Sequence, residues 1–98
     1  MIIVTGSVQT TPATLEDALR MCLEHVKRSR LEPGCLMHSV NHDVEDPNRL
    51  VFLEHWSDLD ALKVHFNLPE CRAFAKSVRA LASEPSPLNI YEATPMAL

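Results

Sequence analysis

The sequence predicts an α+β fold in which four antiparallel strands form one sheet with helices on one of its faces. Three observations carry this prediction: stretches of alternating apolar residues, stretches with apolar residues at helical spacing, and a turn near Pro47 that divides the chain. The elements follow in the order strand, helix, strand, and then strand, two helices, strand. This order is typical of a ferredoxin-like sandwich, and a chain of 98 residues suits a single domain over residues 1–98.

The first half begins with a predicted strand over residues 2–9, where apolar and polar residues alternate. Thr11 and Pro12 predict the start of a helix, because proline suits the first helical position. Apolar residues then recur at helical spacing until residues 32–35, Glu-Pro-Gly-Cys, which predict the turn that ends this helix. A second strand is predicted over residues 36–43.

The second half begins with a predicted strand over residues 49–56, which contains an apolar run without Gly or Pro. Ser57 is the expected N-cap of a short helix, because its hydroxyl can accept a hydrogen bond from the first turn. Pro69 is expected to begin a second helix. Residues 88–93 are expected to form the last strand.

Both faces of the predicted sheet are apolar. On the third strand, Leu50, Phe52 and Trp56 point one way, whereas Val51 and Leu53 point the other. Helices can cover only one of these faces, and an exposed apolar face marks an interaction site. We therefore expect a homodimer in which the sheets of two copies stack across a two-fold axis.

The composition of the chain restricts the classes of binding partner and the cellular compartment that we expect. The net charge of −4 and the absence of a long basic run argue against nucleic acid. No stretch approaches the roughly 20 apolar residues of a membrane span. The three cysteines show no C-x-x-C spacing, and the first residues do not read as a secretory signal. A reduced, cytoplasmic protein that contacts neither nucleic acid nor membrane is therefore expected.

Three short features of the sequence occur together. Glu32-Pro33-Gly34-Cys35 precedes the second strand, Glu54-His55-Trp56 ends the third, and His65 lies on the following helix. In this combination, the chain from about Ile2 to Glu92 resembles the antibiotic biosynthesis monooxygenase (ABM) family. The resemblance implies a ferredoxin-like protomer in a dimeric α+β barrel, with a pocket between sheet and helices.

The resemblance also implies a range of activities. Members of the family include oxygenases that act on quinols and polycyclic phenols without flavin, haem or metal, whereas others degrade haem or isomerise small metabolites. The position of the haem ligand is occupied by Ala75 here, so haem is not expected. We expect a cofactor-independent monooxygenase that oxidises a hydroquinone or polycyclic phenol with O₂. An isomerase or epimerase of a small metabolite and a non-catalytic small-molecule-binding dimer remain alternatives.

His65 is the first candidate for a general base and His38 the second, because an imidazole can take up a proton near neutral pH. A hydrogen-bonded structural role is the alternative for His65. Glu54 could act as a base, but a structural pairing with an arginine such as Arg72 or Arg79 is favoured. The expected substrate-binding residues are Phe52, Glu54, Trp56, Leu62, Phe66 and Phe74, with burial in the core as the alternative for Trp56.

The remaining histidines do not predict a metal site. His38 and His42 are four residues apart on one strand, about 13 Å, which is too far to share an ion. His25 is expected on a helix and His55 on the opposite sheet face. We therefore expect no metal and no other cofactor, and a zinc or iron site remains the alternative. Among the cysteines, Cys35 is the one to test for reactivity, because it follows a glycine turn.

Overall fold

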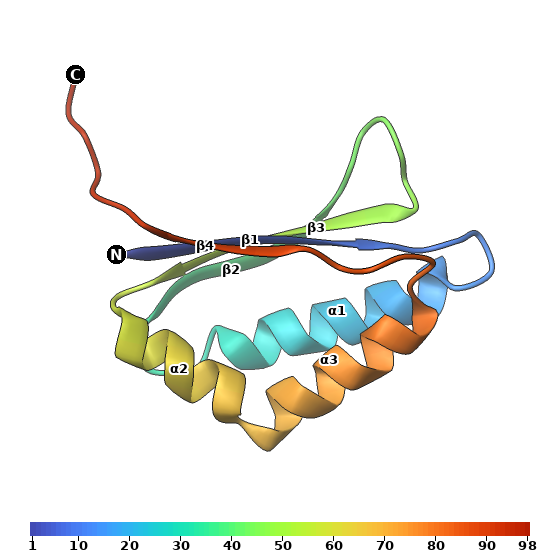
Figure 1. Ribbon diagram of the computed structural model, residues 1–98, viewed down its shortest axis with the longest axis horizontal. Helices are drawn as coiled ribbons and strands as arrows, with labels where there is room; N and C mark the ends of the chain where they lie inside the picture. Colours follow the sequence, from blue (N-terminus) through green and yellow to red (C-terminus); the bar gives the residue numbers. More distant parts are fainter.

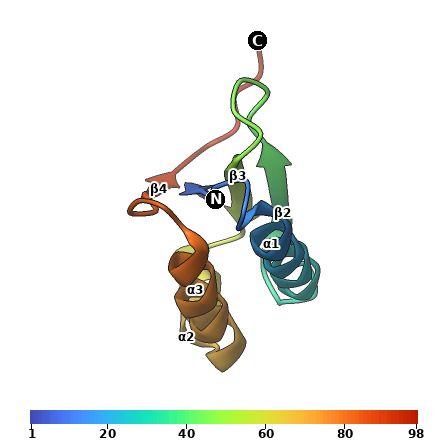
Figure 2. The ribbon, with the colours of Figure 1, turned by 90° about the vertical axis from the view of Figure 1, so that its right-hand side faces the viewer.

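The computed structural model describes residues 1–98 and shows four antiparallel strands in one sheet with three helices on a single face (Figure 1). The elements are β1 Ile2–Gln9, α1 Leu15–Ser29, β2 Cys35–His42, β3 Arg49–Trp56, α2 Leu59–Asn67, α3 Pro69–Leu81 and β4 Leu88–Glu92. The strands lie in the order β2-β3-β1-β4. Figure 2 shows α1 beneath one side of the sheet and α2 and α3 beneath the other. The predicted ferredoxin-like fold class is confirmed.

Strand β3 lies in the interior of the sheet and organises the core. Its residues Leu50, Phe52, Glu54 and Trp56 alternate toward the helices, and all four are buried. Leu50 and Phe52 belong to a core cluster that includes residues of α1 and α3. Trp56 belongs to a second cluster with Leu62 and the first residues of β1. Glu54 lies between Phe52 and Trp56 on this face, so a polar group separates the two apolar clusters.

The face of the sheet that points away from the helices also carries apolar side chains. Val51 and Leu53 of β3 point to this face, and Ile3 of β1 pairs with Tyr91 of β4 on it. Figure 1 shows the helices on the opposite side, whereas the β2–β3 loop and the C-terminal tail extend on this one. We call Ile3, Val51, Leu53 and Tyr91 the outer sheet face.

The structure corrects the predicted starts of two helices. Helix α1 begins at Leu15, three residues after Pro12, because residues 12–14 form a turn first. Asp58, and not Ser57, caps α2, because its carboxylate accepts a hydrogen bond of 2.8 Å from a backbone N–H in the first turn. None of the three helices combines the length and the apolar character that a membrane span requires.

Gly34 connects α1 to β2 through a turn that requires glycine. Its φ angle is +83°, and a Cβ atom there would lie 2.6 Å from Cβ of Ala61 and 2.8 Å from Oγ of Ser57. We expect Gly34→Ala to lower the free energy of unfolding by about 1–3 kcal/mol, measured by urea denaturation. Gly6→Ala is the matched control, because its φ is not positive and the added Cβ would lie 3.2 Å from the side-chain end of Leu88 and 3.4 Å from the carbonyl oxygen of Pro87. Equal losses in the two variants would contradict the prediction.

Candidate active site

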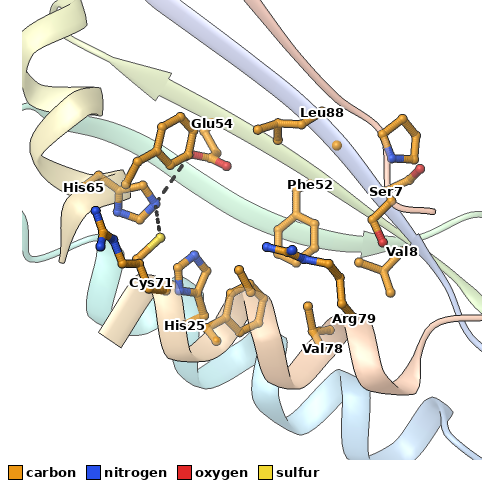
Figure 3. Close-up of a pocket in the computed structure, with 17 residues that line it drawn as sticks. Ser7, Val8, His25, Phe52, Glu54, His65, Cys71, Val78, Arg79 and Leu88 are labelled. Carbon is orange, nitrogen blue, oxygen red and sulfur yellow. Dashed lines mark hydrogen bonds and ion pairs between the residues drawn. The ribbon is translucent and has the colours of Figure 1, made fainter. Parts of the chain in front are cut away.

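A cavity of about 390 Å³ lies between the sheet and α3. Aromatic rings supply part of its apolar wall: Phe52, Phe66 and Phe74. Ser7 and Arg79 lie at one end of the cavity, and four other polar side chains lie toward the opposite end, as Figure 3 shows. We call these four residues the polar end: His25, Glu54, His65 and Cys71. The volume is in the range that accommodates a small organic molecule.

His65 lies in the last turn of α2, and Glu32 from the α1–β2 connection fixes its ring. Nδ1 of His65 lies 2.9 and 3.0 Å from the two carboxylate oxygens of Glu32. Because an ionised carboxylate can only accept, Nδ1 carries a proton, and in the neutral ring Nε2 then presents a lone pair. Nε2 lies 3.6 Å from Sγ of Cys71 and 4.0 Å from Oε1 of Glu54. In its neutral form, His65 therefore has the tautomer of a proton acceptor at the polar end.

Glu54 is a buried carboxylate that β3 directs toward the helices. Oε1 accepts a hydrogen bond of 2.9 Å from Nε1 of Trp56, and Nε2 of His38 lies 3.3 Å from the same oxygen. Burial raises the pKa of Glu54, but the rings of His38, Trp56 and His65 together outweigh burial, so the net pKa is lowered. Glu54 is therefore an anion at neutral pH.

The side chain of His38 on β2 is fully enclosed, and its ring nitrogens have no hydrogen-bond partner. The sheet register places it beside Glu54, and its side chain is inaccessible to solvent. The 3.3 Å approach to Glu54 is not aligned for a hydrogen bond, so both ring nitrogens of His38 are unpaired. Buried polar atoms almost always have partners, and exceptions of this kind call for an explanation.

Helix α1 adds a third histidine, His25. Its ring centroid lies 5.3 Å from those of His38 and His65, and the ring stacks on Phe74 at 3.9 Å. Burial lowers the pKa of His25 to about 3, with further lowering from His38 and His65. At neutral pH this imidazole is uncharged. Three elements far apart in the sequence thus bring three imidazoles into contact.

Cys71 of α3 completes the polar end. Burial, followed by the carboxylates of Glu32 and Glu54, raises its pKa to about 11. It is therefore a thiol whose S–H can donate to Nε2 of His65. Cys35, which the sequence indicated for a reactivity test, does not line the cavity, and its pKa is also raised, first by burial. Neither environment favours a nucleophilic thiolate.

Five of the eight residues predicted for the site line the cavity: Phe52, Glu54, His65, Phe66 and Phe74. His38, Trp56 and Leu62 do not line it, because Trp56 and Leu62 are packed in the core and His38 is enclosed beside Glu54. The expected pairing of Glu54 with an arginine is wrong. Arg72 donates instead to the side chain of Asn67, and Glu54 interacts with the rings around it.

The expectation that no group of metal-binding side chains assembles is also wrong. The donor atoms of His38, Glu54 and His65 lie within 4.8 Å of one another, as do those of His25, His65 and Cys71. The spacing along β2 excluded only that His38 and His42 bind the same ion. It did not exclude a site in which His38 binds an ion together with side chains from β3 and α2.

Sequence reasoning missed His25, Glu32 and Cys71 as parts of the site. A signal existed for His25, because it lies between Cys22 and Val26 on the buried stripe of α1. Glu32 belongs to the Glu-Pro-Gly-Cys motif of the sequence analysis, but this motif does not indicate that the Glu32 side chain hydrogen-bonds a histidine 33 residues later. No sequence signal places Cys71 beside that histidine.

A model of the family described as antibiotic biosynthesis monooxygenase matches residues 1–77. The chain belongs to the ABM family. The matched segment contains β1, β2, β3, α1 and α2, and it includes every residue of the polar end.

Relatives and solved structures agree with this assignment. An uncharacterized protein of Synechocystis sp. is 30% identical over 91 residues, which is 93% of this chain and 62% of that protein. The chain thus spans less than two thirds of this curated relative. A proposed ABM protein of Deinococcus radiodurans has a TM-score of 0.94 at 23% identity, covering 100% of this chain and 97% of that one. Another antibiotic biosynthesis monooxygenase structure has a TM-score of 0.89 at 26% identity, covering 97% of this chain and 100% of that one.

Proposed function

We propose that this ABM domain is a cofactor-independent monooxygenase that oxidises a hydroquinone or polycyclic phenol with O₂. The observation that carries the proposal is the Glu32–His65 pair, in which the hydrogen bond at Nδ1 leaves Nε2 directed to the polar end of a partly aromatic cavity. Family membership supports the class of reaction. A flat phenolic ring can pack against the aromatic wall while its hydroxyl reaches the imidazole.

His65 is the proposed general base. A substrate hydroxyl within hydrogen-bonding distance of Nε2 gives up its proton there, and the Glu32 carboxylate stabilises the imidazolium that forms. Glu54, 4.0 Å from Nε2, places a second carboxylate at this end of the cavity. His38, the other candidate, does not line the cavity, which favours His65 in this role.

The proposed oxidation resides in the substrate. The phenolate passes one electron to O₂, and the resulting phenoxyl radical and superoxide combine to form a C–O bond at a ring carbon. The O–O bond of this peroxide then breaks, so that one oxygen atom remains as a quinone carbonyl and the other leaves as water. The protein contributes deprotonation, orientation and exclusion of bulk water.

Oxygen uptake by chelator-treated protein, measured with a panel of hydroquinones and polycyclic phenols, tests the proposal. We expect one O₂ to be consumed per substrate molecule, and labelled O₂ should place one labelled atom in the quinone. Turnover of a small metabolite under argon would instead support an isomerase or epimerase. Ligand binding without turnover of any substrate would support the non-catalytic alternative.

We also propose that the protein is a homodimer formed through the outer sheet face. The helices leave this face uncovered, and Val51 and Leu53 carry its apolar surface across the interior strand β3. We expect sedimentation equilibrium to show a dimer at micromolar concentration and Leu53→Lys to shift it to monomer. Val64→Lys, on the exposed side of α2, is the control and should remain dimeric. A stable unmodified monomer would contradict the proposal.

A further inference from the structure

We infer that His38, Glu54 and His65 form a binding site for a divalent transition-metal ion such as Zn²⁺. The three side chains come from β2, β3 and α2, and their donor atoms lie within 4.8 Å of one another. Two imidazoles and one carboxylate form a ligand set that zinc and other first-row metals use in proteins. All three residues are buried, so an ion there would be shielded from solvent.

The distances between donor atoms are close to those of a coordinated ion. Oε1 of Glu54 lies 3.3 Å from Nε2 of His38 and 4.0 Å from Nε2 of His65. Ligands bonded at 2.0–2.1 Å around a tetrahedral ion are about 3.4 Å apart. The edge between Glu54 and His38 already has this length. The distance between Glu54 and His65 is longer, and the donor atoms of His38 and His65 lie within 4.8 Å of each other, so these side chains must approach each other further to coordinate one ion.

The unpaired ring of His38 is an independent reason for this assignment. Both of its nitrogens are buried, and neither has a hydrogen-bond partner. A buried imidazole in this state lacks the interactions that water would give it. An ion bound to Nε2 of His38 supplies a partner for one of these two nitrogens. This observation favours the set with His38 over the other donor set, His25, His65 and Cys71.

Two neighbouring side chains already hold two of the three proposed ligands, His65 and Glu54, in place. Glu32 accepts the Nδ1 proton of His65 and so leaves Nε2 free to bind an ion. The indole N–H of Trp56 donates to Glu54 and fixes its carboxylate. Metal-binding histidines in proteins are usually oriented by a carboxylate or carbonyl in this way.

The metal site and the proposed base share one atom. An ion on Nε2 of His65 occupies the lone pair that would accept the substrate proton, so the two roles exclude each other at any one time. Zn²⁺ should therefore inhibit the proposed oxygenase reaction. The metal inference does not rest on that reaction, because ion binding is measured without substrate.

Calorimetric titration of the chelator-treated protein with Zn²⁺ at neutral pH tests the inference. We expect one ion per protomer with a dissociation constant below about 10 µM. His38→Gln and Glu54→Gln should each weaken binding by at least about 100-fold, and Glu32→Gln by about 10–100-fold. His42→Gln, exposed at the end of the same strand as His38, is the matched control and should bind normally. Circular dichroism checks that each variant is folded.

Absorption of the unaltered protein with Co²⁺ gives a second readout that needs no variant. We expect visible bands of a low-coordinate cobalt ion without the near-ultraviolet band of a cobalt–thiolate bond. Failure of the unaltered protein to bind Zn²⁺ more tightly than about 1 mM would overturn the inference. A thiolate band, with binding lost in Cys71→Ser and retained in His38→Gln, would overturn it as well and place the ion on the other set.

Discussion

His65→Gln should lower the rate of oxygenation of a hydroquinone or phenol by about 100- to 10,000-fold, the usual contribution of a general base. Glutamine is similar in length, and its amide N–H can still donate to Glu32, but its side chain cannot accept a proton at neutral pH. The change therefore removes the base while it preserves the contact that positions residue 65. Initial rates of O₂ uptake measure the effect.

His42→Gln is the matched control, because His42 is exposed and its ring hydrogen-bonds the carbonyl of Pro47, away from the cavity. Its rate should equal that of the unaltered protein. A His65→Gln variant that retains full activity would show that His65 is a structural residue at the end of α2. The proposed base would then be wrong even if the protein is an oxygenase.

Trp56→Phe should lower the free energy of unfolding by about 1.5–3 kcal/mol, because it removes a buried hydrogen bond to a charged group. Nε1 of Trp56 donates to Oε1 of Glu54 at 2.9 Å, and the indole is inaccessible to solvent. Trp56→Ala should cost about 3–5 kcal/mol, since it also leaves a cavity in the core. Urea denaturation followed by circular dichroism measures both changes.

Val64→Ala provides the baseline for these measurements, because Val64 is 59% exposed on α2. Val64→Ala should change the free energy of unfolding by no more than about 0.5 kcal/mol. If Trp56→Phe left stability unchanged but raised the KM for an aromatic substrate, Trp56 would be a wall of the binding site and not the core residue that the structure indicates.

The fold could be predicted from the sequence because each element carries its own periodicity. Strand β3 was predicted with its observed bounds, since large apolar side chains alternate along it without interruption. The helix starts were harder, because Ser57 and Asp58 are adjacent and either side chain can cap a helix. Which one does so depends on the angle at which the chain leaves β3, and that angle is set by packing.

The candidate site could be predicted only in part. His65 and Glu54 lie on elements whose buried faces could be recognised in the sequence, so their orientation toward the interior could be predicted. Their hydrogen-bond partners could not be predicted, because contacts such as that of Glu32 with His65 depend on how α1 and α2 lie across the sheet. The choice of an arginine for Glu54 assumed that a buried carboxylate needs a cation. In the structure an indole N–H and neighbouring imidazoles serve instead.

Trp56 is the single tryptophan of the chain, and its ring centroid lies 4.6 Å from that of His65. Indole fluorescence responds to charge and to bound ions at this range. The protein therefore carries an intrinsic fluorophore beside the atom on which both proposals depend. Its emission can follow protonation of that imidazole, or its occupation by an ion or a ligand, in solution and without an added label.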